Sequence, residues 1–140
     1  MKNTHTVSKT FSFCYGHRLM DDPGRCRHLH GHTAKVAFTL ERGELDENGM
    51  VVHFDRLKET IGCWIDENLD HRMLLCDRDP IAATLKNAGE RLFEMKENPT
   101  AENIAMMLYE LAKKFNLPIA KVEVWESETS KASFSSEGAL

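Results

Sequence analysis

Hydrophobic and polar residues alternate along two stretches in the first third of the chain. From Val7 to His17 the larger side chains occupy the odd positions, and from His30 to Leu40 a period-2 pattern resumes on the even positions. This alternation predicts two β-strands, because successive side chains of a strand point to opposite faces of the sheet. The turn-forming run Asp21-Asp22-Pro23-Gly24 between them predicts a reversal of the chain.

Apolar residues at helical spacing predict two main helices. The first is expected to begin with Asp55 as its cap and to end near Asn68, and the second begins with Thr100 as its cap and ends at Asn116 and Pro118. Between the two predicted helices, the stretch from residue 77 to residue 98 predicts only a short helix, over residues 81–86.

The remaining apolar runs predict further strands. Met50 to Phe54 is a short apolar run that we expect to extend the sheet, Val122 to Glu126 is a third clear strand, and Ala132 to Phe134 is a fourth. The order strand, strand, helix, helix, strand, strand predicts an α+β fold, in which an antiparallel four-stranded sheet has its helices packed on one face.

Composition indicates one globular domain spanning residues 1–140. Hydrophobic residues make up 41% and charged residues 29%, which excludes a disordered or fibrous chain. The net charge of −4 argues against a nucleic-acid partner. Apolar runs are too short for a membrane span and the polar start lacks a signal-peptide core, so we expect a cytoplasmic protein with reduced cysteines.

Histidines cluster close to Cys26. His30 and His32 lie two residues apart on one predicted strand and therefore share a face, and neutral imidazoles are typical zinc ligands. The third ligand is His17, at the end of the neighbouring strand, or His28; the spacing does not decide between them. Three histidine ligands would leave the open fourth position of a catalytic zinc site. If Cys26 itself filled that position, the site would be closed and structural.

Other polar residues are candidates for acid–base chemistry or binding. The cationic neighbours of Cys26 favour a thiolate that can take and return protons. Asp70 and His71 offer a carboxylate next to an imidazole. Glu102 lies in the first turn of a predicted helix, where a carboxylate favours the helix dipole. Glu126 continues the apolar face of a predicted strand, where a carboxylate is either at the sheet margin or faces a paired donor.

Six motifs make the sequence similar to a known family. From Phe11 to about Phe134 the chain resembles the 6-pyruvoyltetrahydropterin synthase and 6-carboxytetrahydropterin synthase family. The matching motifs, in the order of the family, are FSFCYGHRL, CRHLHGH, GMVVHFDRLK, LDHRML, ENPTAENIA and VEVWES.

The resemblance implies a catalytic centre. It makes Cys26 the catalytic thiol, with Asp70 and His71 completing a proton relay. The zinc ligands that it implies are His17, His30 and His32.

The resemblance also implies a substrate and an assembly. Glu126 matches the glutamate that anchors the pterin, and Glu102 matches a supporting carboxylate in a Pro-Thr-x-Glu motif. The implied fold is the tunnelling fold (T-fold), in which the sheets of three subunits close into a barrel and two trimers stack as a homohexamer. In such an assembly Asp70 and His71 could serve the Cys26 of a neighbouring subunit.

Three residues separate Cys26 from His30, the spacing associated with the 6-carboxytetrahydropterin synthase of the queuosine route. We therefore expect a zinc lyase that converts 7,8-dihydroneopterin triphosphate to 6-carboxytetrahydropterin, acetaldehyde and triphosphate. The alternatives are a 6-pyruvoyltetrahydropterin synthase and a non-catalytic, zinc-stabilised pterin-binding protein. By charge alone, the triphosphate could contact Arg27, Lys35 and Lys131.

Three features depart from the family pattern. His53 stands where Asp is expected, Phe134 stands where Tyr is usual, and the segment from Leu75 to Lys96 is longer than in compact members. The two substitutions touch no proposed catalytic group, and the longer segment is expected to alter a rim of the site.

Overall fold

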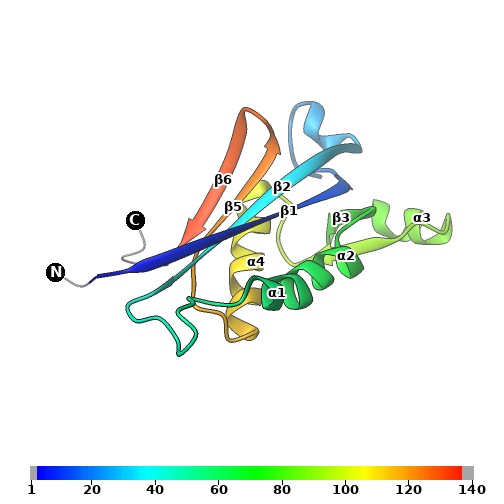
Figure 1. Ribbon diagram of the computed structural model, residues 1–140. Coiled ribbons are helices and arrows are strands. Elements are labelled where there is room, and N and C mark those ends of the chain that lie inside the picture. Colours follow the sequence, from blue (N-terminus) through cyan, green and yellow to red (C-terminus); the bar gives the residue numbers. More distant parts are fainter. Residues whose placement is uncertain (1–2, 137–140) are drawn as a thin grey trace.

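A curled six-stranded sheet forms the framework of the computed structural model, which describes residues 3–136 (Figure 1). The strand order is β4-β3-β1-β2-β5-β6. The pairs β1–β2, β2–β5 and β5–β6 are antiparallel, whereas β1–β3 and β3–β4 are parallel. The strands are β1 (His5–His17), β2 (His30–Arg42), β3 (Arg72–Cys76), β4 (Leu92–Met95), β5 (Ile119–Ser127) and β6 (Ser130–Ser135).

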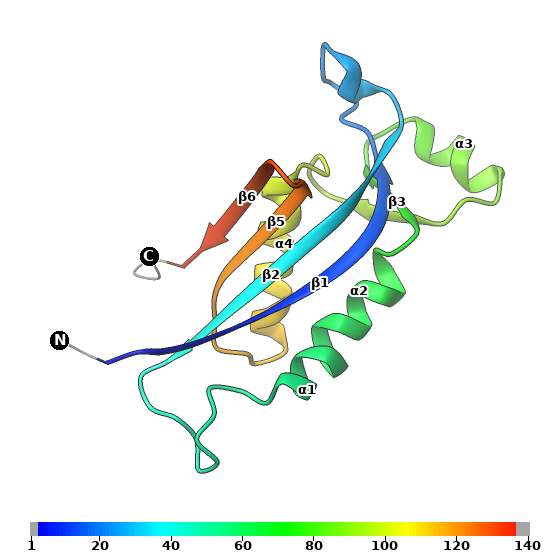
Figure 2. The same ribbon diagram turned by 45° about the horizontal axis from the view of Figure 1, so that its top comes forward.

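The helices cover one face of this sheet. Figure 2 shows α4 behind β2 and β5, with α1 and α2 alongside β1. The first predicted helix is confirmed as one continuous helical stretch that includes a π-helical turn, and the second ends close to the predicted position. The helical segments are η1 (Arg25–Arg27), α1 (Phe54–Leu57), η2 (Lys58–Gly62), α2 (Cys63–Asn68), α3 (Ile81–Asn87) and α4 (Ala101–Lys114).

The core lies between the sheet and the helices α1, η2, α2 and α4, and it follows the predicted alternation. Phe13 and Tyr15 on β1 and Val36 and Phe38 on β2 are buried there, and the apolar face of α4 packs against them. The same inward-facing positions continue to the end of β1 and the start of β2, where His17 pairs with His30. The histidines therefore occupy the last layer of a hydrophobic face.

The α+β class and the four predicted strands are confirmed, and those four strands pair antiparallel. The sheet as a whole is six-stranded and mixed rather than four-stranded and antiparallel, because β3 and β4 join it in parallel. The expectation that residues 50–54 extend the sheet is wrong. The carboxylate of Asp46 accepts hydrogen bonds from the backbone N–H groups of Asn48 and Met50, at 2.9 and 3.0 Å, and so holds residues 46–50 in a turn, and Phe54 already begins α1. Val51 is buried in the core without belonging to a strand.

The two single-residue departures have local explanations. His53, and not the predicted Asp55, caps α1, because its Nδ1 accepts the backbone N–H of Asp55 at 3.0 Å. The ring nitrogen of His53 thus accepts the hydrogen bond that the carboxylate of an aspartate cap would accept. Phe134 packs edge-on against Tyr109 of α4, with ring centroids 5.0 Å apart.

In the described part of the chain, no helix is long and apolar enough to cross a membrane.

Candidate metal centre and active site

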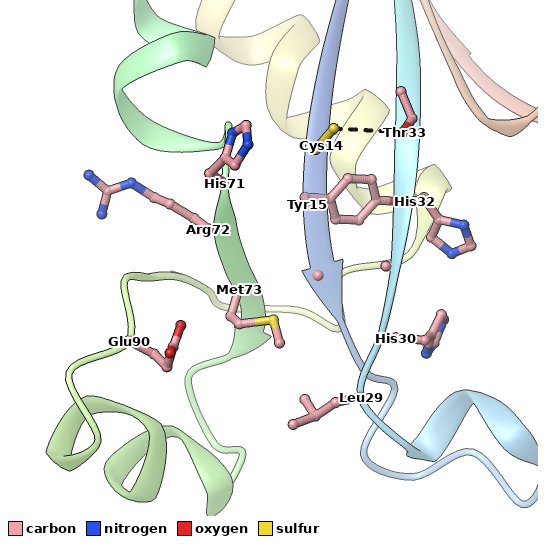
Figure 3. Close-up of a pocket in the computed structure, with 12 residues that line it drawn as sticks. Cys14, Tyr15, Leu29, His30, His32, Thr33, His71, Arg72, Met73 and Glu90 are labelled. Atoms are coloured by element: carbon pink, nitrogen blue, oxygen red, sulfur yellow. Dashed lines mark hydrogen bonds between the residues drawn. The ribbon is translucent and has the colours of Figure 1, made fainter.

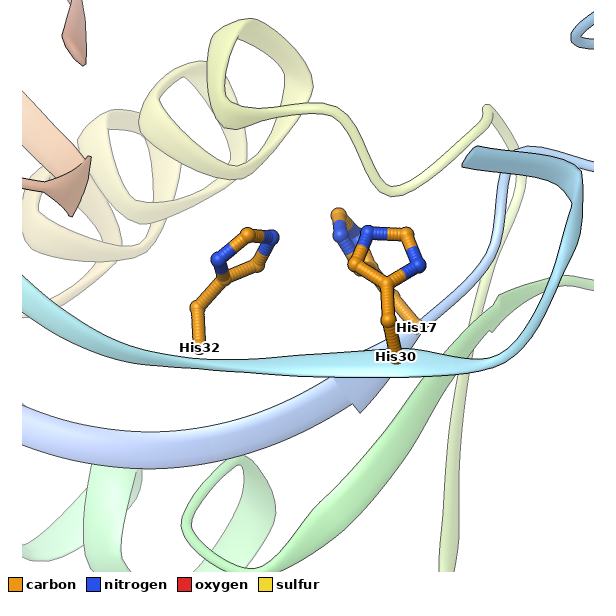
Figure 4. Close-up of side chains that lie close together, drawn as sticks. All are labelled: His17, His30 and His32. Atoms are coloured by element: carbon orange, nitrogen blue, oxygen red, sulfur yellow. The ribbon is translucent and has the colours of Figure 1, made fainter. Parts of the chain in front are cut away.

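Three imidazoles meet where β1 ends and β2 begins (Figure 4). The antiparallel register places His17 opposite His30, and His32 lies two residues further along the same face. Ring centroids are 4.5 Å apart for His17 and His30, 5.0 Å for His17 and His32, and 5.1 Å for His30 and His32. One nitrogen of each ring lies within 4.8 Å of the others, which is close enough for a single metal ion to bind all three.

Backbone carbonyls orient two of these rings. The Nδ1 of His17 lies 2.7 Å from the carbonyl oxygen of Pro99, and the Nδ1 of His30 lies 2.7 Å from the carbonyl oxygen of His28. Because a carbonyl can only accept, each Nδ1 must carry the proton, and each Nε2 keeps a lone pair. The buried Nε2 atoms of His17 and His32 have no hydrogen-bond partner among the described residues.

Burial keeps His17 in the form that a metal requires. The residue is 2% exposed, and burial lowers its pKa to about 4, with smaller contributions in the same direction from His30 and His32. The Pro99 carbonyl opposes this shift without cancelling it. At neutral pH the ring is therefore uncharged and able to donate a lone pair, so the donor set fits a zinc ion.

The structure separates the alternatives that the sequence leaves open. His17 lies in the cluster, whereas His28 contributes only the carbonyl that orients His30. Cys26 is exposed in the 3₁₀ turn η1 and is not a member of the cluster in the described chain. Three nitrogen donors without a thiolate are the donor set typical of catalytic rather than closed structural zinc sites.

Asp70 and His71 form a hydrogen-bonded pair at the start of β3. The Nδ1–H of His71 donates to Asp70 Oδ2 at 2.8 Å, and Asp70 Oδ1 accepts the backbone N–H of Cys14 at 2.9 Å. The Cys14 N–H is the main reason that the pKa of Asp70 lies below its ordinary value, and His71 lowers it further. His71 itself has a left-handed backbone, with φ of 59°, and donates its own N–H to Cys14.

His71 lines a cavity of about 510 Å³ (Figure 3). The cavity is also lined by Cys14, Arg72, Met73 and Glu90, the last from the longer segment after β3. Cys26 is not among its lining residues. One chain therefore does not bring the predicted thiol and the predicted relay into this cavity.

The two predicted substrate carboxylates share a different cavity, of about 460 Å³. Glu102 enters it from the first turn of α4 and Glu126 from β5, and Lys131 and Leu19 also line it. Glu126 Oε2 lies 3.9 Å from His32 Nε2, so the cavity adjoins the imidazole cluster. Of the three basic residues suggested as contacts for the triphosphate, Arg27, Lys35 and Lys131, only Lys131 lines this cavity together with the two carboxylates.

Sequence reasoning missed two features of this site. Tyr15 is 3% exposed, and its hydroxyl has no partner among the described residues; burial, and then the charge of Glu126, raise its pKa above the ordinary value. Its position on the face of β1, two residues before His17, was the available signal. The other feature is Asp79, which lies buried in the longer segment and pairs with Arg18.

Comparison with known proteins finds one matching family and relatives that share a name. The sequence profile of the family described as 6-pyruvoyl tetrahydropterin synthase matches residues 6–137. The 6-carboxy-5,6,7,8-tetrahydropterin synthase of Rickettsia bellii is 37% identical over 103 residues, which cover 72% of this chain and 75% of the relative. The enzyme of the same name from Aquifex aeolicus is 30% identical over 159 residues, covering 94% of this chain and 98% of the relative.

Solved structures share the fold. An uncharacterized protein from Wolinella succinogenes superposes with a TM-score of 0.82 at 27% identity, covering 96% of this chain and 99% of the other. The 6-pyruvoyl tetrahydropterin synthase of Caenorhabditis elegans superposes with a TM-score of 0.72 at 23% identity, covering 96% and 97%. The second likeness shows the fold alone.

Proposed function

The chain belongs to the 6-pyruvoyl tetrahydropterin synthase family, and on that premise we propose that it is a zinc-dependent 6-carboxy-5,6,7,8-tetrahydropterin synthase. One observation supports this most directly: three imidazoles converge beside a cavity lined by two carboxylates, and the buried Nε2 atoms of His17 and His32 have no hydrogen-bond partner among the described residues. The names of the Rickettsia and Aquifex relatives support the carboxy product, as does the spacing between Cys26 and His30.

The proposed reaction takes 7,8-dihydroneopterin triphosphate and one water to 6-carboxytetrahydropterin, acetaldehyde and triphosphate. The side-chain carbon next to the ring is oxidised to the carboxyl group, the dihydropterin ring is reduced to the tetrahydro form, and the two outer side-chain carbons leave as acetaldehyde. No external oxidant or reductant is needed. The 6-carboxytetrahydropterin formed would enter the biosynthesis of 7-deazapurines such as queuosine, and the enzyme would act in the cytoplasm.

The metal would be held by His17, His30 and His32. When bound, zinc supplies a Lewis acid that polarises the side-chain hydroxyls of the substrate and makes their O–H and neighbouring C–H protons more acidic. The backbone carbonyls of Pro99 and His28 keep two of the rings in the ligating tautomer.

Other residues of this chain would bind the pterin and move its protons. The carboxylate of Glu126 accepts from the pterin amino group and ring N–H as a bidentate partner, with Glu102 supporting it in the same cavity. Cys26 takes a proton from the side chain of the substrate, and the imidazole of His71, held by Asp70, returns one. Because Cys26 does not line the cavity of His71, we propose that the relay acts across subunits of a homohexamer.

Product analysis tests this function. Purified protein is incubated with 7,8-dihydroneopterin triphosphate, and acetaldehyde and pterin products are quantified. Release of acetaldehyde with 6-carboxytetrahydropterin supports the proposal, a pyruvoyl product without acetaldehyde identifies the sister enzyme, and no turnover of zinc-loaded protein supports a binding protein. Cys26→Ala is expected to reduce turnover by about 10²–10⁴-fold with unchanged zinc content.

A further inference from the structure

The three imidazoles are held in two different ways. His30 and His32 both belong to β2, so a single strand sets their spacing. His17 is the last residue of β1, and the chain leaves the sheet directly after it. Its position therefore depends on what holds the end of that strand.

Residues 72–99 hold the end of β1 through three separate contacts. Leu74 of β3 pairs with His17 in the parallel register of the sheet. The carbonyl of Pro99 accepts the Nδ1–H of His17 at 2.7 Å. Asp79, between these two points in the sequence, binds the side chain of Arg18, the residue that follows His17. Of these contacts, that of Asp79 comes from the longer segment, and those of Leu74 and Pro99 come from the residues that flank it.

The Arg18–Asp79 contact is a two-pronged ion pair. Arg18 Nε donates to Asp79 Oδ2 at 2.7 Å, and Arg18 Nη2 donates to Asp79 Oδ1. The Asp79 side chain is fully buried, and that of Arg18 is 21% exposed. Among the described residues, the buried polar or charged side chains are His17 and Asp79, and Arg18 connects them. A buried carboxylate is unfavourable unless it is paired in good geometry, so the pair has one strongly preferred arrangement.

Asp79 is itself fixed within its own segment. Its Oδ1 accepts the backbone N–H of Ile81 at 2.9 Å, and its backbone N–H donates to the carbonyl of Cys76 at 3.0 Å. The carboxylate is therefore anchored both to the end of β3 and to the start of α3. Through the fork of Arg18, that anchor reaches the residue beside the metal-ligand candidate His17.

We infer that the Arg18–Asp79 pair is a positioning device that holds the His17 imidazole at the metal centre. The inference rests on the proposed function, because it concerns the proposed zinc ligands. Without the pair, the end of β1 can move while β2 stays in place, and the Nε2 of His17 leaves the arrangement set by His30 and His32. Outer partners that orient a ligand typically change metal affinity by about 10–100-fold.

Asp79→Asn tests the inference, with Asp77→Asn as its matched control. Asp77 lies two residues away in the same segment, and its pair with Arg78 is solvent-exposed and 3.7 Å long. Zinc affinity is measured by competition with a chromophoric chelator near neutral pH, on protein shown to be folded by circular dichroism. The visible spectrum of the cobalt-loaded protein reports the ligand geometry.

Asp79→Asn is expected to weaken zinc binding by about 10–100-fold and to alter the cobalt spectrum, while Asp77→Asn matches the wild type. Arg18→Lys keeps the charge but loses the fork, and a smaller loss of zinc affinity is expected; this variant serves as the test if Asp79→Asn does not fold. Unchanged zinc affinity and cobalt spectrum with a lowered melting temperature would show a merely structural pair and overturn the inference. Failure of the wild type to bind zinc would instead contradict the proposed function, and the inference with it.

Discussion

Tyr15→Phe is expected to stabilise the metal-free protein. The Tyr15 hydroxyl is buried and has no hydrogen-bond partner among the described residues, while its ring packs against Phe13, His17 and His32. Phenylalanine keeps these ring contacts and removes only the hydroxyl. A buried polar group without a partner costs about 1–3 kcal/mol.

The expected gain can be worked out from two opposing contributions. Removing the hydroxyl recovers its desolvation penalty, and the gap left by one oxygen atom takes back a few tenths of a kcal/mol, at about 24 cal/mol per Å³ of cavity. The net stabilisation is then about 1 kcal/mol. For a chain of this length, unfolding entropy near the melting temperature is about 0.3 kcal/mol/K, so the melting temperature should rise by about 3 °C.

Urea unfolding and calorimetry of zinc-free protein measure this change, with Tyr109→Phe as the matched control. Tyr109 is also buried, but it lies on α4 against Phe134, and its hydroxyl is not among the unpartnered buried groups of the described residues. A loss of stability in Tyr15→Phe would show that the hydroxyl is hydrogen-bonded in the metal-free protein and would refute the reasoning.

Three further changes test other parts of the fold. Hydrogen bonds from Arg18 lower the pKa of Asp79 in the folded protein. The wild type should therefore be more stable than Asp79→Asn above pH ~4, and this advantage should disappear as the pH falls through the lowered pKa. Urea unfolding curves recorded across this pH range measure the difference. Gly62→Ala would place a Cβ 2.8 Å from Phe11 Cε1, and urea unfolding should show a loss of about 1–3 kcal/mol; wild-type stability would contradict this clash. His53→Ala removes the cap of α1 and should cost about 1 kcal/mol, whereas an unchanged urea midpoint would show that the cap contributes nothing.

The parts of the fold with clear periodicity were predictable from sequence. The alternation along β1 and β2 set which residues face the core, and it placed His30 and His32 on one face. The β3 run from Arg72 to Cys76 contains consecutive apolar residues without alternation, so its strand character depends on pairing with the end of β1. Short strands of this kind have no sequence period that separates them from a buried helical segment.

The candidate site was predictable where local register decides and not where distant residues meet. His17 rather than His28 joins the cluster because the ladder pairs His17 with His30, a contact between two strands. The pair of Arg18 and Asp79 joins residues 61 positions apart, and no local pattern indicates it. The position of Cys26 relative to His71 could not be predicted from local sequence either, since a single chain does not place both residues in one cavity.

X-ray absorption at the zinc edge, on zinc-loaded protein, tests the central claim most directly. Three imidazole nitrogens and one oxygen are expected at about 2.0–2.1 Å from the zinc, with no sulfur scatterer. A sulfur shell at about 2.3 Å that disappears in Cys26→Ala would show a closed structural site and contradict the account.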